Sequence, residues 1–355
     1  MNKVKLIECP RDAMQGIKSH FIPTDAKAQY INALLRVGFD TIDFGSFVSP
    51  KAIPQMRDTA EVLSKLDLSK TESKLLAIVA NIRGAEDASK FEEIDYLGYP
   101  FSISENFQMR NTGKTISESI VILNEILNIS LKTNKEVVAY LSMGFGNPYG
   151  DPWNVKIVSK WTKTLAERGV KILSLSDTIG SSTPDVIQSL FSNLIPAHPN
   201  IEFGAHLHST FKTAVEKVEA AYNSGCRRFD GAIKGFGGCP MATDELTGNM
   251  PTEIMLNYFQ KPGAVDFLDL VGDEKMKFAK DLLQTAIEKK EVTEALIVPK
   301  LKNWDPERIA VIDMILLRLG VCELLYFDTI PTKVSINEYI DLAKEYSTEQ
   351  SGHFV

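Results

Sequence analysis

Short apolar runs alternate with amphipathic helical segments along residues 4–260. The runs lie at 4–9, 41–45, 74–80, 94–100, 135–143, 170–176, 201–208 and 227–233. One strand and one helix recur roughly every thirty residues, which predicts an α/β fold of the (β/α)₈ TIM-barrel type. A doubly wound open sheet is the alternative. It is disfavoured because no GxGxxG motif follows the first run and polar residues end many different runs.

The sequence also predicts several helix boundaries. Thr24 is expected to cap a helix that stops at Gly38, and Ser117 is expected to cap a later one. A further helix is expected over 55–66, and Pro184 is expected in the first turn of another.

The character of the sequence changes after residue 260. The stretch 261–275 has the composition of a linker, and only helical periodicity remains from about residue 276. Helical patterns cover 276–290, 306–327 and 335–347. We therefore expect a barrel domain at 1–265, followed by a small all-helical segment at 266–355.

Composition and charge indicate a globular protein without a nucleic-acid footprint. Of the 355 residues, 44% are hydrophobic and 24% are charged, which allows a large core. The net charge is −7 and no long basic run occurs. The four cysteines lack CxxC spacing, so we expect free thiols in a reducing compartment. Without a signal peptide, transit segment or long apolar span, the sequence predicts a cytoplasmic protein with no membrane contact.

A pair of histidines, His206 and His208, ends the seventh apolar run. Residues two apart in a strand face the same side, so both imidazoles are expected to converge on one divalent metal ion. Asp12 follows the first run and Asn249 follows the eighth, and barrel strand ends share one mouth. Two nitrogen and two oxygen ligands suit Mg²⁺ or Mn²⁺ better than a structural zinc site. The alternatives are two unrelated histidines at a strand end, a turn residue at Asp12 and a helix cap at Asn249.

Arg11 and Cys239 are candidates for catalysis. An arginine beside a metal can stabilise a developing enolate or carbonyl oxygen, whereas its alternative is a surface salt bridge. Cys239 lies in a glycine-rich loop and can donate a proton once that loop closes. The alternative for a cysteine is a small buried apolar residue, which fits Cys9, Cys226 and Cys322 better.

Two aspartates at strand ends complete the candidate site. Asp177 follows the sixth run and can orient a metal ligand or bind substrate, although it can equally cap the next helix. Asp43 lies near the end of the second run, where it can support the site or simply end the strand. The residue types alone do not choose between these alternatives.

At this point the residues resemble a known family. The segments IECPRDAMQ, DFGSFVSPKAIPQM, SLSDTIG, GAHLHST, GFGGCP and GNMPTE follow one another as in 3-hydroxy-3-methylglutaryl-CoA lyases, over about residues 3–260. GFGGCP is the segment that separates this family from related Claisen condensing enzymes. The chain departs from the family pattern at Ala13, where glycine is usual, at Asp43, a glutamate position, and at Ser209, where aspartate is common.

The resemblance implies a divalent-metal-dependent carbon–carbon lyase that cleaves 3-hydroxy-3-methylglutaryl-CoA to acetyl-CoA and acetoacetate. An acyl-CoA is then the substrate, Mg²⁺ or Mn²⁺ the metal, and a homodimer the expected assembly. The implied roles are metal binding for Asp12, His206, His208 and Asn249, catalysis for Arg11, Cys239, His206 and Asp177, and substrate binding for Arg11, Gln15, Asp43 and Ser46. The runner-up activity is a Claisen-type acyltransferase that joins acetyl-CoA to a 2-oxo acid.

The C-terminal segment has a separate resemblance. Trp304 and the stretches ERIAVID and INEYIDLAKEYS resemble the C-terminal half of the transcription antitermination factor NusB, over about residues 276–355. That family is all-helical and binds RNA with a ribosomal-protein partner, so an RNA- or ribosomal-protein-binding adaptor is the alternative function of another class. We do not expect RNA binding, because this segment carries more acidic than basic residues.

Overall fold

The computed structural model describes residues 4–238, 247–259, 273–301, 311–327 and 330–346 of the chain. It separates into two compact units, Met1–Val265 and Asp266–Val355, which are described in turn. No helix among the described residues is long and apolar enough to cross a membrane.

The first unit is a closed parallel barrel in which the strands follow one another in chain order. Its strands are β1 Lys5–Glu8, β2 Thr41–Ser46, β3 Lys74–Ile78, β4 Ile94–Ser102, β5 Glu136–Ser142, β6 Ile172–Ser176, β7 Glu202–His206 and β8 Arg228–Gly231. β8 pairs with β1 in parallel, from Lys5↔Arg228 to Glu8↔Gly231, and this pairing closes the ring. The TIM-barrel prediction is confirmed.

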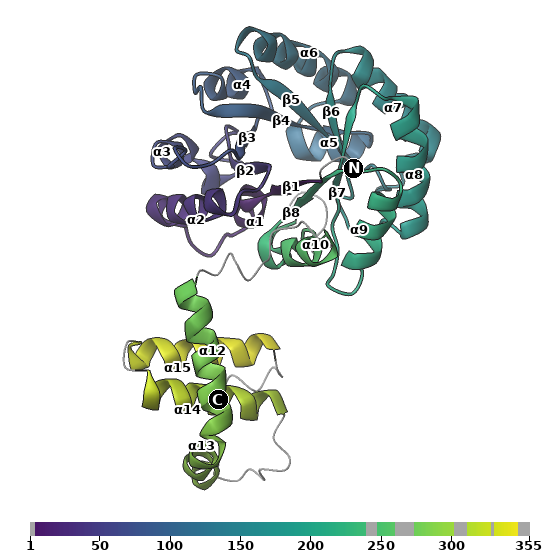
Figure 1. The fold of residues 1–355 in the computed structure, drawn as a ribbon. Coiled ribbons are helices and arrows are strands. Elements are labelled where there is room, and N and C mark those ends of the chain that lie inside the picture. Colours follow the sequence, from purple (N-terminus) through teal and green to yellow (C-terminus); the bar gives the residue numbers. More distant parts are fainter. Residues whose placement is uncertain (1–3, 239–246, 260–272, 302–310, 328–329, 347–355) are drawn as a thin grey trace. The chain divides into compact units, whose positions relative to one another are not determined.

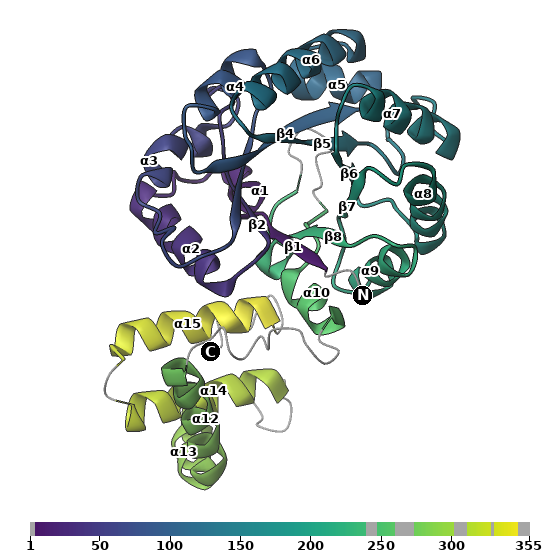
Figure 2. The same cartoon turned by 45° about the horizontal axis from the view of Figure 1, so that its top comes forward.

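Helices form a ring outside the strands (Figures 1 and 2). They are α2 Thr24–Val37, α3 Thr59–Leu63, α4 Ile82–Ala88, α6 Ile116–Lys132, α7 Val155–Glu167, α8 Pro184–Ala197, α9 Ala214–Asn223 and α10 Thr252–Phe259. Two further short helices, α1 Pro10–Gln15 and α5 Glu105–Thr112, follow the ends of β1 and β4. Short 3₁₀ turns occur at Pro54–Met56 and Ile233–Gly235. The predicted start of α8 at Pro184 and the end of α2 before Gly38 are confirmed.

Two helix starts differ from the sequence-based expectation. We expect Ser117 to cap α6, but Thr115 is the cap, because its side chain accepts from the backbone of Glu118 while Glu118 reciprocates. Thr24 is expected to cap α2, but it is the first helical residue, and its hydroxyl instead donates to Asp58 at 2.8 Å. A local capping box thus sets the start of α6, whereas at α2 the distant side chain of Asp58 engages the expected cap.

Several short helices depart from the predicted pattern. The single helix expected over 55–66 is divided into a 3₁₀ turn and α3. Helices α1, α4 and α5 are not anticipated from the sequence, because segments of six to eight residues span too few turns for a clear helical period. The most consequential of these is α1, because it carries Arg11 and Asp12.

The apolar side chains of the barrel are divided between an outer and an inner core. Alternate strand residues face opposite sides, so one set packs under the helices and the other fills the interior. The interior set is Leu76, Tyr96, Val138, Tyr140 and Ile172. Buried polar residues share the strands with it, among them Asp43, Ser174, Arg228 and Asp230. Asp43, Ser174 and Asp230 lie within their strands, whereas Arg228 is the first residue of β8 and lies at the end opposite the mouth.

The second unit is all-helical over its described residues. It contains α12 Asp273–Glu288, α13 Lys290–Ile297, a 3₁₀ turn at Val298–Lys300, α14 Val311–Tyr326 and α15 Thr332–Tyr346 (Figure 1). Helix α13 is not anticipated from the sequence. Two small buried clusters join the helices, one at Leu282, Ala286 and Cys322 and one at Leu316, Tyr339 and Ala343. Trp304, singled out from the sequence, lies outside the described residues.

Candidate active site

A cavity of about 270 Å³ opens at the carboxyl-terminal ends of the strands. Its lining includes the last residues of five strands, which are Ser46, Ile78, Ser142, Ser176 and His206. The active sites of parallel barrels lie at this mouth. Of the residues singled out from the sequence, the lining contains Arg11, Asp12, Gln15, Ser46, His206 and His208.

Asp12, His206 and His208 converge within this cavity from different elements. One carboxylate oxygen and one nitrogen of each ring lie within 4.8 Å of one another. Asp12 lies in α1, and His206 is the last residue of β7. His208 lies beyond the strand and pairs with Asn249 in an isolated antiparallel bridge. The predicted strand at 201–208 is therefore too long, because β7 ends at His206. The two rings nevertheless converge as expected, with 5.4 Å between their centroids.

The electrostatics of this triad fit a hard divalent cation. Burial and the neighbouring His206 lower the pKa of His208 to about 4, so its imidazole is neutral at neutral pH. Burial opposes ionisation of Asp12, but the charge of Arg11 lowers its pKa overall, so the carboxylate is ionised. Burial lowers the pKa of His206, but its hydrogen bond with Asp230 and the charge of that carboxylate raise it overall, so a cation would compete with a proton at this ring. An ionised carboxylate and two imidazoles in their neutral form are a donor set that binds Mg²⁺ or Mn²⁺. The triad is a possible metal site.

Asn249 lies against the triad. Its side-chain nitrogen donates to Asp12 at 2.6 Å and to the carbonyl of Phe236 at 2.8 Å. Asn249 is not in the cap position of α10, because that helix begins three residues later, at Thr252. Gly237 explains how the loop passes so close, because its φ is +100° and an added Cβ would lie 2.6 Å from the Asn249 amide.

Arg11 is buried, which excludes the surface salt bridge considered from the sequence. Its guanidinium donates to Asp12 at 2.8 Å and to Asp43 at 2.5–3.2 Å. Burial raises the pKa of Asp43 to about 6 in spite of that contact. Asp43 is fully buried and is not in the cavity lining, so it holds Arg11 from behind. Gln15, by contrast, lines the cavity and donates to Asp12.

Asp177 lies outside the cavity lining and is fully buried. It accepts hydrogen bonds from Ser182 and from the ammonium of Lys217, the latter at 2.9 Å. Lys217 also donates to the carbonyl of His208 at 2.8 Å. Asp177 does not cap α8, because Thr183 does so. The pair thus fixes the backbone of a triad residue, which agrees with orienting a ligand and not with contacting substrate.

Sequence reasoning missed two residues of this region, Lys217 and Asp230. A signal existed for Lys217, because it lies among Ala214, Val218 and Ala221 on the buried face of α9, where a lysine is unusual. Asp230 had a weaker signal, as a charged residue inside the eighth apolar run. The predicted catalytic Cys239 lies outside the described residues. The two glycines just before it, Gly237 and Gly238, both have positive φ.

The HMGL-like family model matches residues 3–285. The chain belongs to the HMGL-like family. It is 36% identical to the hydroxymethylglutaryl-CoA lyase YngG of Bacillus subtilis over 244 residues, which are 69% of this chain and 80% of that protein. It is 30% identical to the cytoplasmic 3-hydroxy-3-methylglutaryl-CoA lyase of Rattus norvegicus over 289 residues, 81% of this chain and 82% of that one.

Solved structures agree with this membership. The HMG-CoA lyase of Bacillus subtilis superimposes with a TM-score of 0.70 at 33% identity and covers 79% of this chain and 94% of its own. The HMG-CoA lyase of Acinetobacter baumannii, solved with coenzyme A and 3-methylmalate, has a TM-score of 0.69 at 29% identity, with coverage of 78% and 92%. A NusB family model matches residues 254–355, which confirms the second resemblance and extends it upstream of residue 276.

Proposed function

We propose that this HMGL-like chain is a divalent-metal-dependent lyase that cleaves 3-hydroxy-3-methylglutaryl-CoA to acetyl-CoA and acetoacetate. The observation that carries the proposal is the triad of Asp12, His206 and His208 at the barrel mouth, with Arg11 bonded to its carboxylate. The relatives reported above are named as lyases of this substrate, and one of them was solved with coenzyme A.

The triad would hold Mg²⁺ or Mn²⁺, and Asn249 would add an oxygen donor. When bound, the cation supplies Lewis acidity toward the hydroxyl and carboxylate oxygens of the substrate. Asp177 and Lys217 keep His208 in place through its backbone carbonyl. These residues therefore build and orient the metal site without contacting the substrate's thioester.

The substrate itself reacts with a base, with Arg11 and with a proton donor. The candidates for the base are His206 and a carboxylate, and Asp12 is favoured, because metal binding and the contact with Asp230 engage both ring nitrogens of His206. The base takes the tertiary hydroxyl proton, after which the C2–C3 bond breaks and the hydroxyl carbon becomes the ketone of acetoacetate. The electron pair of that bond passes to the thioester as an enolate. Arg11 stabilises the enolate oxygen, because its guanidinium is always charged and Asp43 holds it in one orientation. Cys239, outside the described residues, is the candidate that protonates the enolate carbon to give acetyl-CoA.

Substrate contacts at the cavity wall complete the proposal. Gln15 and Ser46 line the cavity and offer polar groups near Asp12. Val48, Ile53 and Phe107 give the lining an apolar part that suits the acyl chain. Asp43 serves substrate binding through Arg11, since its own carboxylate is buried behind that side chain.

The test is release of acetoacetate from 3-hydroxy-3-methylglutaryl-CoA by the full chain with Mg²⁺ or Mn²⁺, under reducing conditions. We expect chelator to abolish release and added metal to restore it. His208→Ala should reduce turnover by more than the roughly 10–100-fold that loss of an outer hydrogen-bond partner costs. His198→Ala is the matched control, because His198 follows α8 at the opposite end of the barrel strands. Metal-independent release, or no release, would contradict the proposal.

Two other activities have an observation in their favour. The Claisen-type acyltransferase would use the same metal site. Incubating acetyl-CoA with 2-oxo acids and assaying free coenzyme A distinguishes this activity from the lyase.

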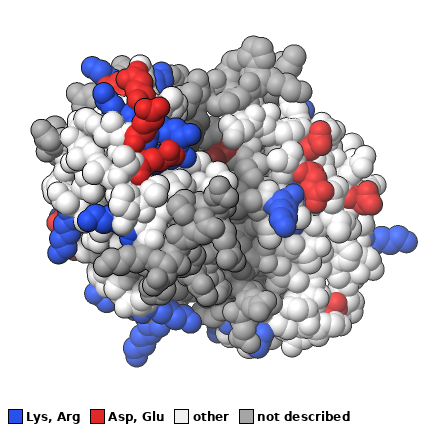
Figure 3. All heavy atoms as spheres, turned by 90° about the horizontal axis from the view of Figure 1, so that it is seen from below, with Lys and Arg blue, Asp and Glu red and all other residues white. Residues whose placement is uncertain are grey.

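The NusB match favours an adaptor that binds RNA or a ribosomal protein. On the face drawn in Figure 3, however, the described basic side chains are scattered among acidic ones, with wide uncharged areas between them. A mobility-shift assay with structured RNA tests this adaptor directly.

Organisation and assembly belong to the same proposal. We propose that the barrel, residues 1–265, carries the activity and that the helical segment, residues 266–355, is a separate domain. Limited proteolysis of the full chain should then cut between them and leave activity with the larger fragment. We also propose that the chain forms a homodimer, which light scattering would detect. Its proposed location is the cytoplasm.

A further inference from the structure

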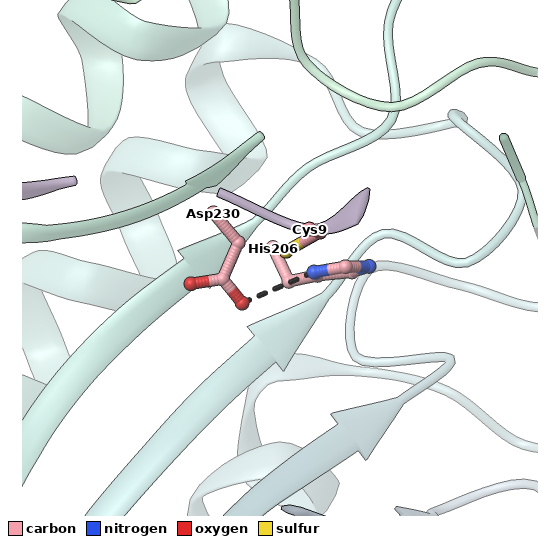
Figure 4. Close-up of side chains that lie close together, drawn as sticks. All are labelled: Cys9, His206 and Asp230. Carbon is pink, nitrogen blue, oxygen red and sulfur yellow. Dashed lines mark hydrogen bonds and ion pairs between the residues drawn. The ribbon is translucent and has the colours of Figure 1, made fainter. Parts of the chain in front are cut away.

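Asp230 lies directly behind the metal-facing ring of His206. His206 ends β7 and Asp230 lies beside it in the register of β8. The Nδ1 atom of His206 is 3.1 Å from Oδ2 of Asp230, as Figure 4 shows. The hydroxyl of Ser174 on β6 donates to the same oxygen at 3.3 Å. Three adjacent strands therefore meet at this carboxylate, and it is almost fully buried.

We propose that Asp230 is the positioning residue that holds His206 as a metal ligand, an inference that rests on the proposed function. A carboxylate only accepts hydrogen bonds, so a neutral His206 must carry its proton on Nδ1. The other ring nitrogen, Nε2, points away from Asp230 in Figure 4 and keeps its lone pair. A metal-binding histidine that donates its second ring N–H to a carboxylate is fixed both in tautomer and in orientation.

The second histidine of the triad is also held by a hydrogen bond at Nδ1. The Nδ1 atom of His208 lies 3.0 Å from the carbonyl oxygen of Thr247, which also accepts only. A proton on Nδ1 of each neutral ring leaves Nε2 with a free lone pair for a metal. The ring of Tyr140 on β5 adds an edge-on contact to His206, with 5.5 Å between ring centroids. His206 is thereby restrained in both position and tilt.

Cys9 raises the question of whether this cluster is a second metal site. Its sulfur and the nearest atoms of His206 and Asp230 lie within 4.8 Å of one another. The Cys9 thiol is fully buried and donates to the carbonyl of Ile7 on β1 at 4.0 Å. The distance of 3.1 Å between His206 and Asp230 is that of a direct hydrogen bond. A hydrogen bond from His206 to Asp230 therefore describes this cluster better than a second ion.

Asp230 has few hydrogen-bond partners other than His206. Its second oxygen, Oδ1, is buried and has no hydrogen-bond partner among the described residues. Few other groups therefore share the role of this carboxylate, so its replacement should act mainly on His206. Replacement by asparagine keeps the shape but adds an N–H donor, which can donate to Nδ1 and move the imidazole proton to Nε2, the metal-facing position.

The experiment compares Asp230→Asn with Ser174→Ala in the full chain. Mn²⁺ affinity is measured by calorimetric titration, and the tautomer of His206 by ¹⁵N NMR of the metal-free protein, which has only five histidines to assign. We expect Asp230→Asn to weaken Mn²⁺ binding about 10–100-fold and to move the His206 proton to Nε2. Ser174→Ala removes the other bond to the same oxygen but keeps the carboxylate, so its Mn²⁺ affinity should stay within about twofold of wild type.

Two results would overturn the inference. One is an Asp230→Asn variant that binds Mn²⁺ as tightly as wild type, and the other is a wild-type His206 that carries its proton on Nε2. The second needs no variant, so it decides the matter even where Asp230→Asn fails to fold. Neither readout uses an acyl-CoA. A chain that binds Mn²⁺ as expected but releases no acetoacetate would refute the proposed function and leave the role of Asp230 standing.

Discussion

Lys217→Met should destabilise the barrel strongly, although it removes no apolar contact. Lys217 is almost fully buried in α9, and its ammonium donates to Asp177 at 2.9 Å, to the carbonyl of Gly180 at 3.0 Å and to that of His208 at 2.8 Å. Methionine has nearly the same length and volume, so little cavity forms. What remains is a buried Asp177 carboxylate without its counter-charge, together with two carbonyls that lose a donor.

The magnitude follows from burial. The side chains of Lys217 and Asp177 are 3% and 0% exposed, so solvent does not screen the pair. Removing one partner of such a pair costs about 3–5 kcal/mol of unfolding free energy, because the other charge stays buried and unpaired. Lys65→Met is the matched control. Lys65 pairs with Asp25 at a similar 2.7 Å, but the two side chains are 40% and 78% exposed, so no resolvable change is expected.

Urea unfolding of the full chain, followed by circular dichroism at neutral pH, measures the difference. We expect the barrel transition of Lys217→Met to move to clearly lower urea with an unchanged slope, and that of Lys65→Met to coincide with wild type. A second substitution, Asp177→Asn, neutralises the orphaned carboxylate and should recover part of the loss in the Lys217→Met background. Equal midpoints for the two lysine variants would refute the reasoning, because they would show that water reaches Asp177.

The remaining predictions concern Glu8 and Gly237. Burial raises the pKa of Glu8 to about 8, so between pH 4.5 and 8 the folded state holds a proton that the unfolded state has lost. Stability should fall as pH rises through this window by up to about 1.4 kcal/mol per pH unit, and urea midpoints should show that Glu8→Gln removes this slope. Gly237→Ala should weaken Mn²⁺ binding at least about tenfold, because its Cβ meets Asn249 at 2.6 Å and the Asp12 carbonyl at 2.7 Å. Gly169→Ala, at the same φ of +100° but in open space, should bind Mn²⁺ normally.

The strand–helix periodicity and the polar residues at the strand ends predict the barrel and most of its mouth. Alternating runs specify strands and helices locally, and parallel strands of a closed barrel must end at one rim. For that reason His206, Asp12 and Arg11 could be placed together before any coordinates were known. The helix starts were less predictable, because several residues near each start can cap and only a partner such as Asp58 decides between them.

The contacts that hold the site in place could not be predicted, because they join residues that are distant in the chain. Asn249 and Asp12 are 237 positions apart in the chain and Lys217 and Asp177 are 40 apart, and such pairs leave no periodic signal in a sequence. The strand pattern left open whether Asp43 supports the site or simply ends its strand, and its burial behind Arg11 favours the supporting role. The physical reason is that a strand's pattern reports which side of the sheet a residue faces, whereas closure of the barrel decides which polar groups meet inside it.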